Sequence, residues 1–391
     1  MAKIFSRKIF TTIILSLLLV LTLVLSSACQ PVFNQEPTAT QSTAKENTYI
    51  SSDCIYSNGY GKVYMTMELI PVDSNDSGAH SMAGTMIFED TNGNKTVVKR
   101  IFGDKPFIDL YMRGKTVYYS VIASENEEDG IYSIKVDGTQ EKCLLDESAS
   151  LIGGYGATPI IKYGNGLYKV VDGKKVKIGS LADKNSGVTL FNGNLYFENK
   201  AYTLDTGETK KFTFKTAVAT KKYMYYISGE DELVMVDKQN TKTELTKNVY
   251  DVLGGNNSKN VVFAKKNSKG ETTFYRLSSA NKLYQLATYT DLYNKAPTYM
   301  DFNNEYYQGN MAARLLNGQV VFLLNEQNEA AFFQVKNTGG TLNLIKDGDM
   351  MFFNTTIGFN RPSFEAVGKN IYYAYGDSEG ETVFYQTIEI K

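Results

Sequence analysis

Residues 48–391 predict an all-β protein of the β-propeller class, and three observations support this prediction. Few windows after residue 48 keep apolar residues at the i, i+3, i+4, i+7 spacing of an amphipathic helix. Short runs of β-branched and aromatic residues, bounded by Gly, Asn and Asp, recur instead. The 391-residue chain also contains 28 Tyr and 21 Phe but no Trp, and Tyr and Phe are enriched in strands.

Residues 1–28 have the regions of a secretory signal peptide. A basic start is followed by the almost wholly apolar residues 9–25, and small residues precede Cys29. A cysteine at this place resembles the lipobox of bacterial lipoproteins, although Ser26 stands where that family prefers leucine. The resemblance implies that Cys29 is diacylated (a palmitate-type lipid anchor), which would hold the chain on the extracytoplasmic face of the cell membrane. The alternative is an uncleaved membrane helix, because about 18 apolar residues can just span a bilayer.

Residues 29–47 predict a flexible linker that carries the lipid anchor. They are rich in Gln, Thr, Ser, Asn and Pro. Such a segment buries too little apolar surface to offset the entropy of ordering it. The predicted organisation is therefore a signal peptide (1–28), a lipid-anchored linker (29–47) and a propeller domain (48–391).

Charge and cysteine content narrow the class of protein. Removing residues 1–28 takes away three basic residues and no acid, so 38 Lys and Arg face 42 Asp and Glu, a net charge of about −4. No basic patch suggests a nucleic-acid partner. Cys54 and Cys143 are either a disulfide pair or two unrelated thiols. The Asn-, Lys- and Tyr-rich composition favours a Gram-positive host.

An internal repeat decides the fold. The clearest copy, "GKTVYYSVIASENEEDGIYSIKVDGTQEKCLL" (114–145), reads as strand, turn, strand, Asp-Gly turn, strand. Similar copies begin near residues 63, 160, 192, 221, 259, 318 and 368. A period of about 40 residues with several strands each is typical of propeller blades.

The repeat also predicts blade number, core and closure. Some copies lie only about 30 residues apart, which is short for a four-stranded blade, so we expect seven blades, with six or eight as alternatives. Most Tyr and Phe should be core, because both faces of a blade are buried by its neighbours. The last copy is short of a full blade, and we expect "NTYISSDCIY" (47–56) to complete it and to close the ring.

One repeat resembles a known group. The strand–Asp-Gly–strand pattern of "GIYSIKVDGTQEKCLL" (130–145) is similar to the repeat of YWTD/TolB-like propellers. The chain as a whole resembles clostridial-type lipoproteins that carry such a propeller as a domain of unknown function. The resemblance implies the fold and extracellular display. The YWTD tetrapeptide is missing, so no ligand site is carried over.

Signals for catalysis or metal binding are sparse. His80 is the single histidine, which excludes multi-histidine metal sites. We interpret it as an exposed loop residue. In the same stretch Asp73, Asn75 and Ser77 match the start of a calcium loop, but Gly84 stands where the bidentate glutamate belongs. Ordinary turn chemistry accounts for the same residues, so calcium is an alternative and no other cofactor is expected.

Three segments break the repeat and are the predicted binding loops: residues 66–84, 288–318 and 352–368. Long connections on a repeat scaffold carry binding surfaces, although these could also only vary outer strands. Tyrosine and arginine are effective anchors for protein or glycan ligands. The candidate binding residues are Tyr289, Tyr293, Tyr299, Tyr306, Tyr307 and Arg361.

The sequence therefore favours a membrane-anchored binding or scaffold protein that holds a protein or cell-wall glycan ligand. The alternative is a hydrolase or lyase of surface polysaccharide on the same scaffold, and a purely structural spacer is a third reading. No acid/base motif selects the enzyme, since 42 acidic residues produce carboxylate pairs in any fold.

Overall fold

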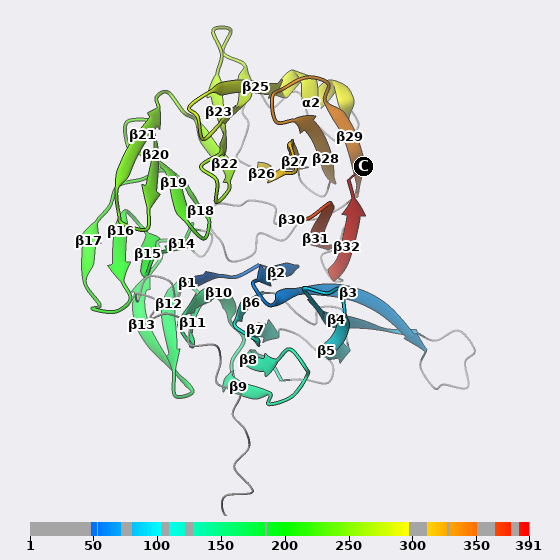
Figure 1. Ribbon diagram of the computed structural model, residues 1–391. Helices are drawn as coiled ribbons and strands as arrows, with labels where there is room; N and C mark the ends of the chain where they lie inside the picture. Colours follow the sequence, from blue (N-terminus) through cyan, green and yellow to red (C-terminus); the bar gives the residue numbers. More distant parts are fainter. Residues whose placement is uncertain are drawn as a thin grey trace, which may run out of the picture. The chain divides into compact units, whose positions relative to one another are not determined.

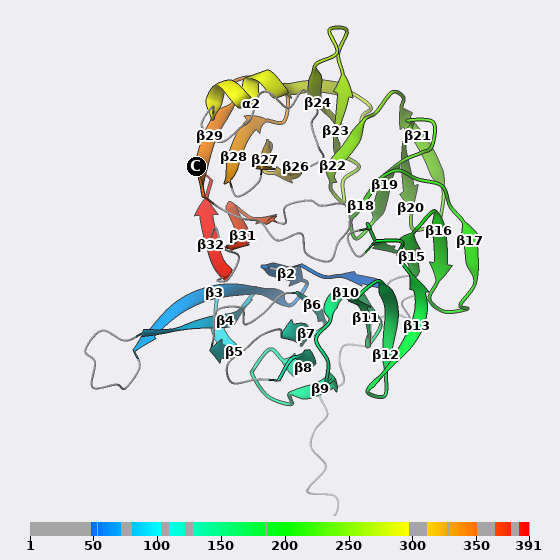
Figure 2. The ribbon, with the colours of Figure 1, turned by 180° about the vertical axis from the view of Figure 1, so that it is seen from behind.

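The computed structural model describes residues 48–52, 54–71, 80–102, 109–121, 128–183, 186–296, 311–326, 329–349, 364–376 and 383–390. They fall within one unit, residues 44–391. They form a ring of eight antiparallel sheets, an all-β propeller (Figure 1; the reverse view is Figure 2). None of the helices in these ranges is long and apolar enough to cross a bilayer.

Blades 1 to 4 each contain four consecutive strands, ordered from the channel outward. Blade 1 has β2 (Ile55–Asn58), β3 (Gly61–Pro71), β4 (His80–Asp90) and β5 (Lys95–Phe102). Blade 2 has β6 (Leu110–Arg113), β7 (Thr116–Val121), β8 (Gly130–Lys135) and β9 (Lys142–Leu145). Blade 3 has β10 (Ser150–Tyr155), β11 (Thr158–Tyr163), β12 (Gly166–Val171) and β13 (Lys174–Ser180). Blade 4 has β14 (Thr189–Phe191), β15 (Asn194–Phe197), β16 (Lys200–Thr203) and β17 (Thr209–Lys211).

Blades 5 to 7 repeat this plan, and blade 8 has three strands in the described residues. Blade 5 has β18 (Ala217–Ala219), β19 (Tyr223–Ile227), β20 (Leu233–Asp237) and β21 (Lys242–Thr246). Blade 6 has β22 (Asp251–Gly255), β23 (Val261–Lys266), β24 (Thr272–Leu277) and β25 (Leu283–Thr288), followed by helix α2 (Tyr289–Lys295). Blade 7 has β26 (Met311–Leu316), β27 (Gln319–Glu326), β28 (Glu329–Lys336) and β29 (Asn343–Asp349). Blade 8 has β30 (Phe364–Val367), β31 (Asn370–Gly376) and β32 (Val383–Glu389).

The eight-blade count agrees with the eight repeat copies and replaces the preferred count of seven. The length argument failed at blade 4, whose four strands need only residues 189–211. Short turns between the strands make such a compact blade possible. Asn192 and Gly193 have φ values of 50° and 74°, which suit the two-residue hairpin turns that reverse the chain most tightly.

Strand direction divides the connections between two faces. Neighbouring strands in a blade are antiparallel, so the turns between first and second strands lie on one face, together with those between third and fourth strands. We call this the tight-turn face. The turns between second and third strands and the links from blade to blade lie on the other face, which we call the connection face.

The N-terminal strand does not close the ring as expected. β1 (Thr48–Ile50) pairs with β10, the innermost strand of blade 3, and lies on the inner side of the ring (Figure 1). Ile55–Asn58 is the innermost strand of blade 1 rather than part of blade 8. The prediction that residues 47–56 complete the last blade is therefore wrong. The reason is that β10 offers them an edge inside the channel.

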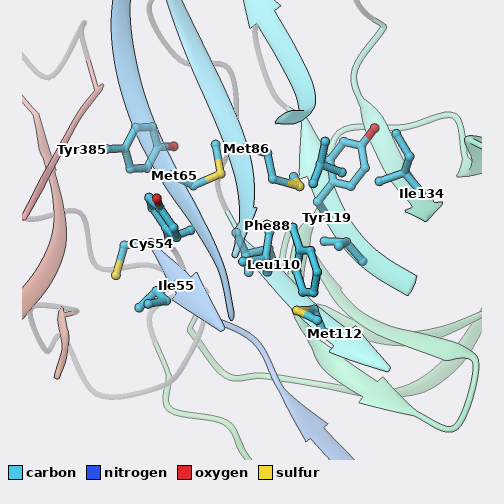
Figure 3. Packing of buried hydrophobic residues seen from close by; sticks show 14 of the residues in the cluster. Cys54, Ile55, Met65, Met86, Phe88, Leu110, Met112, Tyr119, Ile134 and Tyr385 are labelled. Atoms are coloured by element: carbon cyan, nitrogen blue, oxygen red, sulfur yellow. The ribbon is translucent and has the colours of Figure 1, made fainter. Parts of the chain in front are cut away.

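Side-chain packing closes the ring instead. A single apolar cluster joins blades 1, 2 and 8, and Figure 3 shows Tyr385 of β32 beside Met65 of β3. Tyr372 of β31 also belongs to it, with its ring centroid 5.7 Å from that of Tyr64. The prediction that aromatic residues form the core is confirmed. The largest fully buried side chains include Tyr111, Tyr225, Tyr373, Phe263, Phe322 and Phe332.

The two cysteines of the propeller lie in different settings. Cys54 is buried near blade 8, where its Sγ lies 3.3 Å from the Tyr372 carbonyl oxygen. Cys143 is exposed in β9, and no disulfide joins the two. Of the alternatives from the sequence, separate thiols are observed.

Candidate functional site

The central channel holds a cavity of about 390 Å³. Its wall is made by β1 and by the innermost strands of blades 1, 4, 5, 6, 7 and 8. The two faces of each blade pack against its neighbours, so the edge of each innermost strand faces the channel and consecutive residues of these strands line it. Backbone, hydroxyl, amide and charged groups therefore converge on one space.

An ion pair in the described wall of the cavity joins two neighbouring innermost strands. Arg314 of β26 places Nη2 3.1 Å from Oε1 of Glu365 in β30. The guanidinium carbon also lies 5.1 Å from the centre of the Phe364 ring. Both charged side chains keep partial contact with solvent, so the pair contributes about 1 kcal/mol or less to stability. Its groups remain available to a ligand.

Lys221 reaches across the channel. It follows the innermost strand of blade 5, and its Nζ donates a hydrogen bond to the Ser57 carbonyl oxygen of blade 1 at 2.6 Å. The ammonium also lies 5.4 Å from the centre of the Tyr56 ring. Surrounding protein lowers the pKa of Lys221, and the negative charge of Glu365 partly opposes this. Burial raises the pKa of Tyr56, so the phenol stays neutral.

Asn192 supplies a fixed polar group at the same wall. It is 5% exposed, and its Nδ2 donates to the Lys238 carbonyl oxygen at 2.9 Å and to Oδ1 of Asn240 at 3.1 Å. The carbonyl partner determines which amide atom is nitrogen. Oδ1 of Asn192 is left as a buried acceptor with no hydrogen-bond partner among the described residues. Such a group costs free energy until a donor reaches it.

The charged groups in the described cavity wall are mostly cations. Glu365 is the single carboxylate among the described residues that line the cavity, whereas glycoside hydrolysis uses two. Across the described ranges, no three His, Cys, Asp or Glu side chains gather closely enough to hold a metal ion. Cations, amides and hydroxyls on a fixed wall can orient a polar ligand by hydrogen bonds.

The predicted binding tyrosines separate into two groups. Tyr289 and Tyr293 lie on α2, beside the outer strands of blade 6, where both rings are half-buried against the cluster shared by blades 6 and 7. Their role as ligand anchors stays a prediction, and it concerns the exposed parts of the rings. The other predicted residues lie outside the described ranges: Cys29, Asp73, Asn75, Ser77, Tyr299, Tyr306, Tyr307 and Arg361.

The described ends of the three predicted binding segments lie on one face. Segment 66–84 belongs to a hairpin, because β3 and β4 stay paired as far as Pro71 and His80, and this hairpin projects beyond the ring (Figure 1). The described parts of this segment, residues 66–71 and 80–84, are strand where a loop was expected, and His80 begins β4. The links from blade 6 to blade 7 and from blade 7 to blade 8 also start and end on the connection face. The three segments come from consecutive blades, because blade 8 adjoins blade 1.

The residues that line the cavity were not among the candidates from the sequence. Lys221 and Asn192 follow innermost strands, which are the shortest and least distinctive part of each repeat. Arg314 and Glu365 are single charges in apolar strands, at "MAARLL" and "FEAV". A charge in such a run was the available signal, but the sequence does not show that the two strands are neighbours.

Comparison with known proteins extends no further than the fold. No protein-family model and no curated protein matches the sequence. A similar solved structure is an oligogalacturonate lyase in complex with manganese, at 9% identity and TM-score 0.39, covering 88% of this chain and 96% of that one. Another is the propeller domain of the Trilobed protease from Pyrococcus furiosus, which has an open velcro topology, at 10% identity and TM-score 0.38, covering 88% and 98%. At these values the likeness concerns the scaffold alone.

Proposed function

We propose that this chain is an extracytoplasmic lipoprotein, anchored through Cys29, whose propeller binds a protein or cell-wall glycan. The ligand would occupy the connection face over blades 6, 7, 8 and 1 and the adjoining channel. The membership in the clostridial-type lipoproteins with YWTD/TolB-like propellers is part of the same proposal. The observation that carries it is that the described ends of all three long segments lie on one arc of one face.

One part of the cavity wall supports this placement, whereas Asn192 and Lys221 lie at the tight-turn end of the channel. Arg314 and Glu365 lie on β26 and β30, the two strands that begin where the second and third segments re-enter the ring. A ligand seated on that arc would therefore meet the ion pair first. Because the pair is only partly buried, exchanging one of its contacts for a ligand contact costs little.

A photo-cross-linking experiment on whole cells tests whether the ligand is a protein. A cross-linking amino acid replaces Lys295, at the end of α2 on the connection face, in the tagged full-length chain. The matched control carries it at Thr341, an exposed turn residue of blade 7 on the tight-turn face. We expect one near-stoichiometric partner from position 295 and only background from position 341.

Background from both positions would reject a protein ligand, and a shared partner would reject the assigned face. If both positions give only background, the purified protein is tested for glycan binding and glycan degradation. Binding without cleavage, weakened by Arg314→Ala, keeps the binding proposal. Turnover of a polysaccharide would replace it with the hydrolase or lyase alternative.

A further inference from the structure

The turns nearest the channel form a ring of positive charge on the tight-turn face. They join the first and second strands of the eight blades: residues 59–60, 114–115, 156–157, 192–193, 220–222, 256–260, 317–318 and 368–369. All eight are described, and they contain no Asp or Glu. They contain five lysines, which we call the lysine ring: Lys115, Lys221, Lys222, Lys259 and Lys369.

The lysine ring is accessible, although Lys221 reaches into the channel and interacts with the negative charge of Glu365. All five side chains are exposed. The ion pairs seen among the described residues include none of them. Lys115 and Lys259 instead lie 5.8 Å and 5.7 Å from the ring centres of Tyr60 and Tyr223, which leaves their positive charge intact.

The connection face has the opposite character. Its turns and links carry acidic residues, among them Glu128, Asp129, Asp146, Glu147, Glu198, Glu230, Asp231, Glu232 and Glu271. The outer turns of the tight-turn face also carry acids, among them Asp137, Asp172, Asp205 and Glu208, so the positive charge of this face is concentrated in the lysine ring around the channel. An anionic surface would attract the lysine ring and repel the acidic connection face.

Hydrogen bonds between blades hold the lysine ring in place. Asn58 Nδ2 donates to the Gly114 carbonyl oxygen at 2.9 Å, and Asn317 Nδ2 donates to the Gly368 carbonyl oxygen at 2.7 Å. The Lys222 N–H donates to Oδ1 of Asn257 at 3.0 Å. The cations are thus presented on a rigid plane, which suits an extended surface better than a small ion.

The chain from the predicted anchor enters at the same face. Thr48 pairs with Tyr155, at the tight-turn end of β10, and its Oγ1 accepts a hydrogen bond from the Gly193 N–H at 2.7 Å. Residues 30–47 precede it. For a flexible polar linker of that length, the average end-to-end distance is about 24 Å.

We propose that the lysine ring docks the tight-turn face onto the anionic head groups of the membrane that holds Cys29. Each lysine close to an anionic membrane favours docking by about fivefold. The linker keeps the ring within a short distance of the surface, so several weak contacts are enough. The connection face then points away from the membrane, toward the ligand. This inference rests on the lipid anchor of the proposed function.

The test uses the full-length lipidated protein in vesicles. A fluorophore is attached to Gln239→Cys, on a tight turn of blade 5, or to Ser268→Cys, on the connection face of blade 6, each in a Cys143→Ser background. The vesicles carry a quencher on their head groups and contain either zwitterionic lipid alone or about a third phosphatidylglycerol. We expect severalfold stronger quenching at position 239 than at 268 in anionic vesicles only, and loss of the difference in 0.5 M salt.

Two matched variants test whether the lysine ring causes the difference in quenching. Lys115, Lys222, Lys259 and Lys369→Gln removes the ring but keeps Lys221, which lines the cavity, and should abolish the difference. Lys200, Lys215, Lys269 and Lys295→Gln removes the same charge from the connection face and should keep it. Equal quenching at both positions, or a difference that survives loss of the ring, would overturn the proposal.

Failure of the anchor gives a different result. A protein that does not float with any vesicle lacks the lipid anchor, whereas one that floats without a quenching difference has the anchor but does not dock. A third result, lysine-dependent binding to soluble polyglycerol phosphate without docking on anionic vesicles, would replace the membrane with a wall polymer and would also overturn the proposal.

Discussion

Replacement of Tyr372 by alanine should open the propeller at one place. Tyr372 is 4% exposed and belongs to the cluster that joins blade 8 to blade 1. In the described residues blades 1 and 8 share no strand, and the junction is held by side-chain packing together with the contact between Cys54 Sγ and the Tyr372 carbonyl oxygen. Elsewhere in the ring the chain itself also links neighbouring blades.

The expected loss of stability is about 4 kcal/mol. Truncating a buried aromatic residue to alanine costs about 3–5 kcal/mol, and the paired ring of Tyr64 adds about 1 kcal/mol. The alanine variant no longer has to remove a phenol hydroxyl from water on folding, which offsets part of this loss. Tyr372→Phe keeps the ring and loses the hydrogen bond to Lys62, so it should cost about 1 kcal/mol.

The assay combines denaturant unfolding with amide hydrogen exchange. Unfolding gives the total loss, and exchange shows where the structure opens. In Tyr372→Ala the amides of β30, β31 and β32 should exchange faster, while those of β22–β25 should not change. Phe263→Ala, at the junction of blades 5 and 6, should lose a similar free energy without this local effect.

The reasoning would be refuted by uniform exchange across all blades in Tyr372→Ala. It would also be refuted by a loss below about 1 kcal/mol, because the junction would then depend on contacts other than this cluster.

Three further predictions concern other elements. Gly254→Ala should cost about 2–4 kcal/mol by thermal unfolding, because a Cβ there would lie 2.0 Å from a carbonyl oxygen of the next innermost strand, while Gly229→Ala, which meets only one methyl group at 3.5 Å, should be nearly neutral. Thr288→Ala removes the N-cap of α2 and should cost about 1 kcal/mol, a result contradicted if the melting temperature is unchanged. Hydrogen bonds from Thr139 lower the pKa of Asp137, so its contribution is present above its usual value of 3.8 and lost as pH falls through the lower folded value. Asp137→Asn should therefore flatten the dependence of stability on pH below about pH 4, and an unchanged slope would contradict this.

The repeat predicted most of the architecture because each blade is a local unit. Strand, turn and strand lie within about 40 residues, and their periodicity and turn residues are readable in one dimension. The way in which the propeller ring closes could not be predicted from such a local pattern. Whether residues 48–50 join β10 or blade 8 depends on which edge is nearer in space, and a three-residue strand carries too little pattern to decide it.

The candidate site was predictable only in part. The long segments stand out as breaks in the repeat, and their common face follows from an even number of strands in each blade from 1 to 7. The lysine ring had a signal that was overlooked, because several repeat copies open with lysine: "GKTVYY", "KKYMYY", "KNVVF" and "GKNIYY". The pairing of Arg314 with Glu365 had none, since 51 residues separate them and only the ring makes them neighbours.

The position of β1 has a mechanical consequence. Any tension on the N-terminal segment enters the domain at Thr48 and runs along the channel axis, so it loads the three residue pairs between β1 and β10 together, in shear. These pairs are far fewer than the pairs within any blade. Under load β1 should slide out first, releasing residues 48–50 and lengthening the connection by about 10 Å before the load reaches the bridge between Ser52 and Leu110. Tension on the anchor would thus lengthen the N-terminal linker before it unfolds any blade.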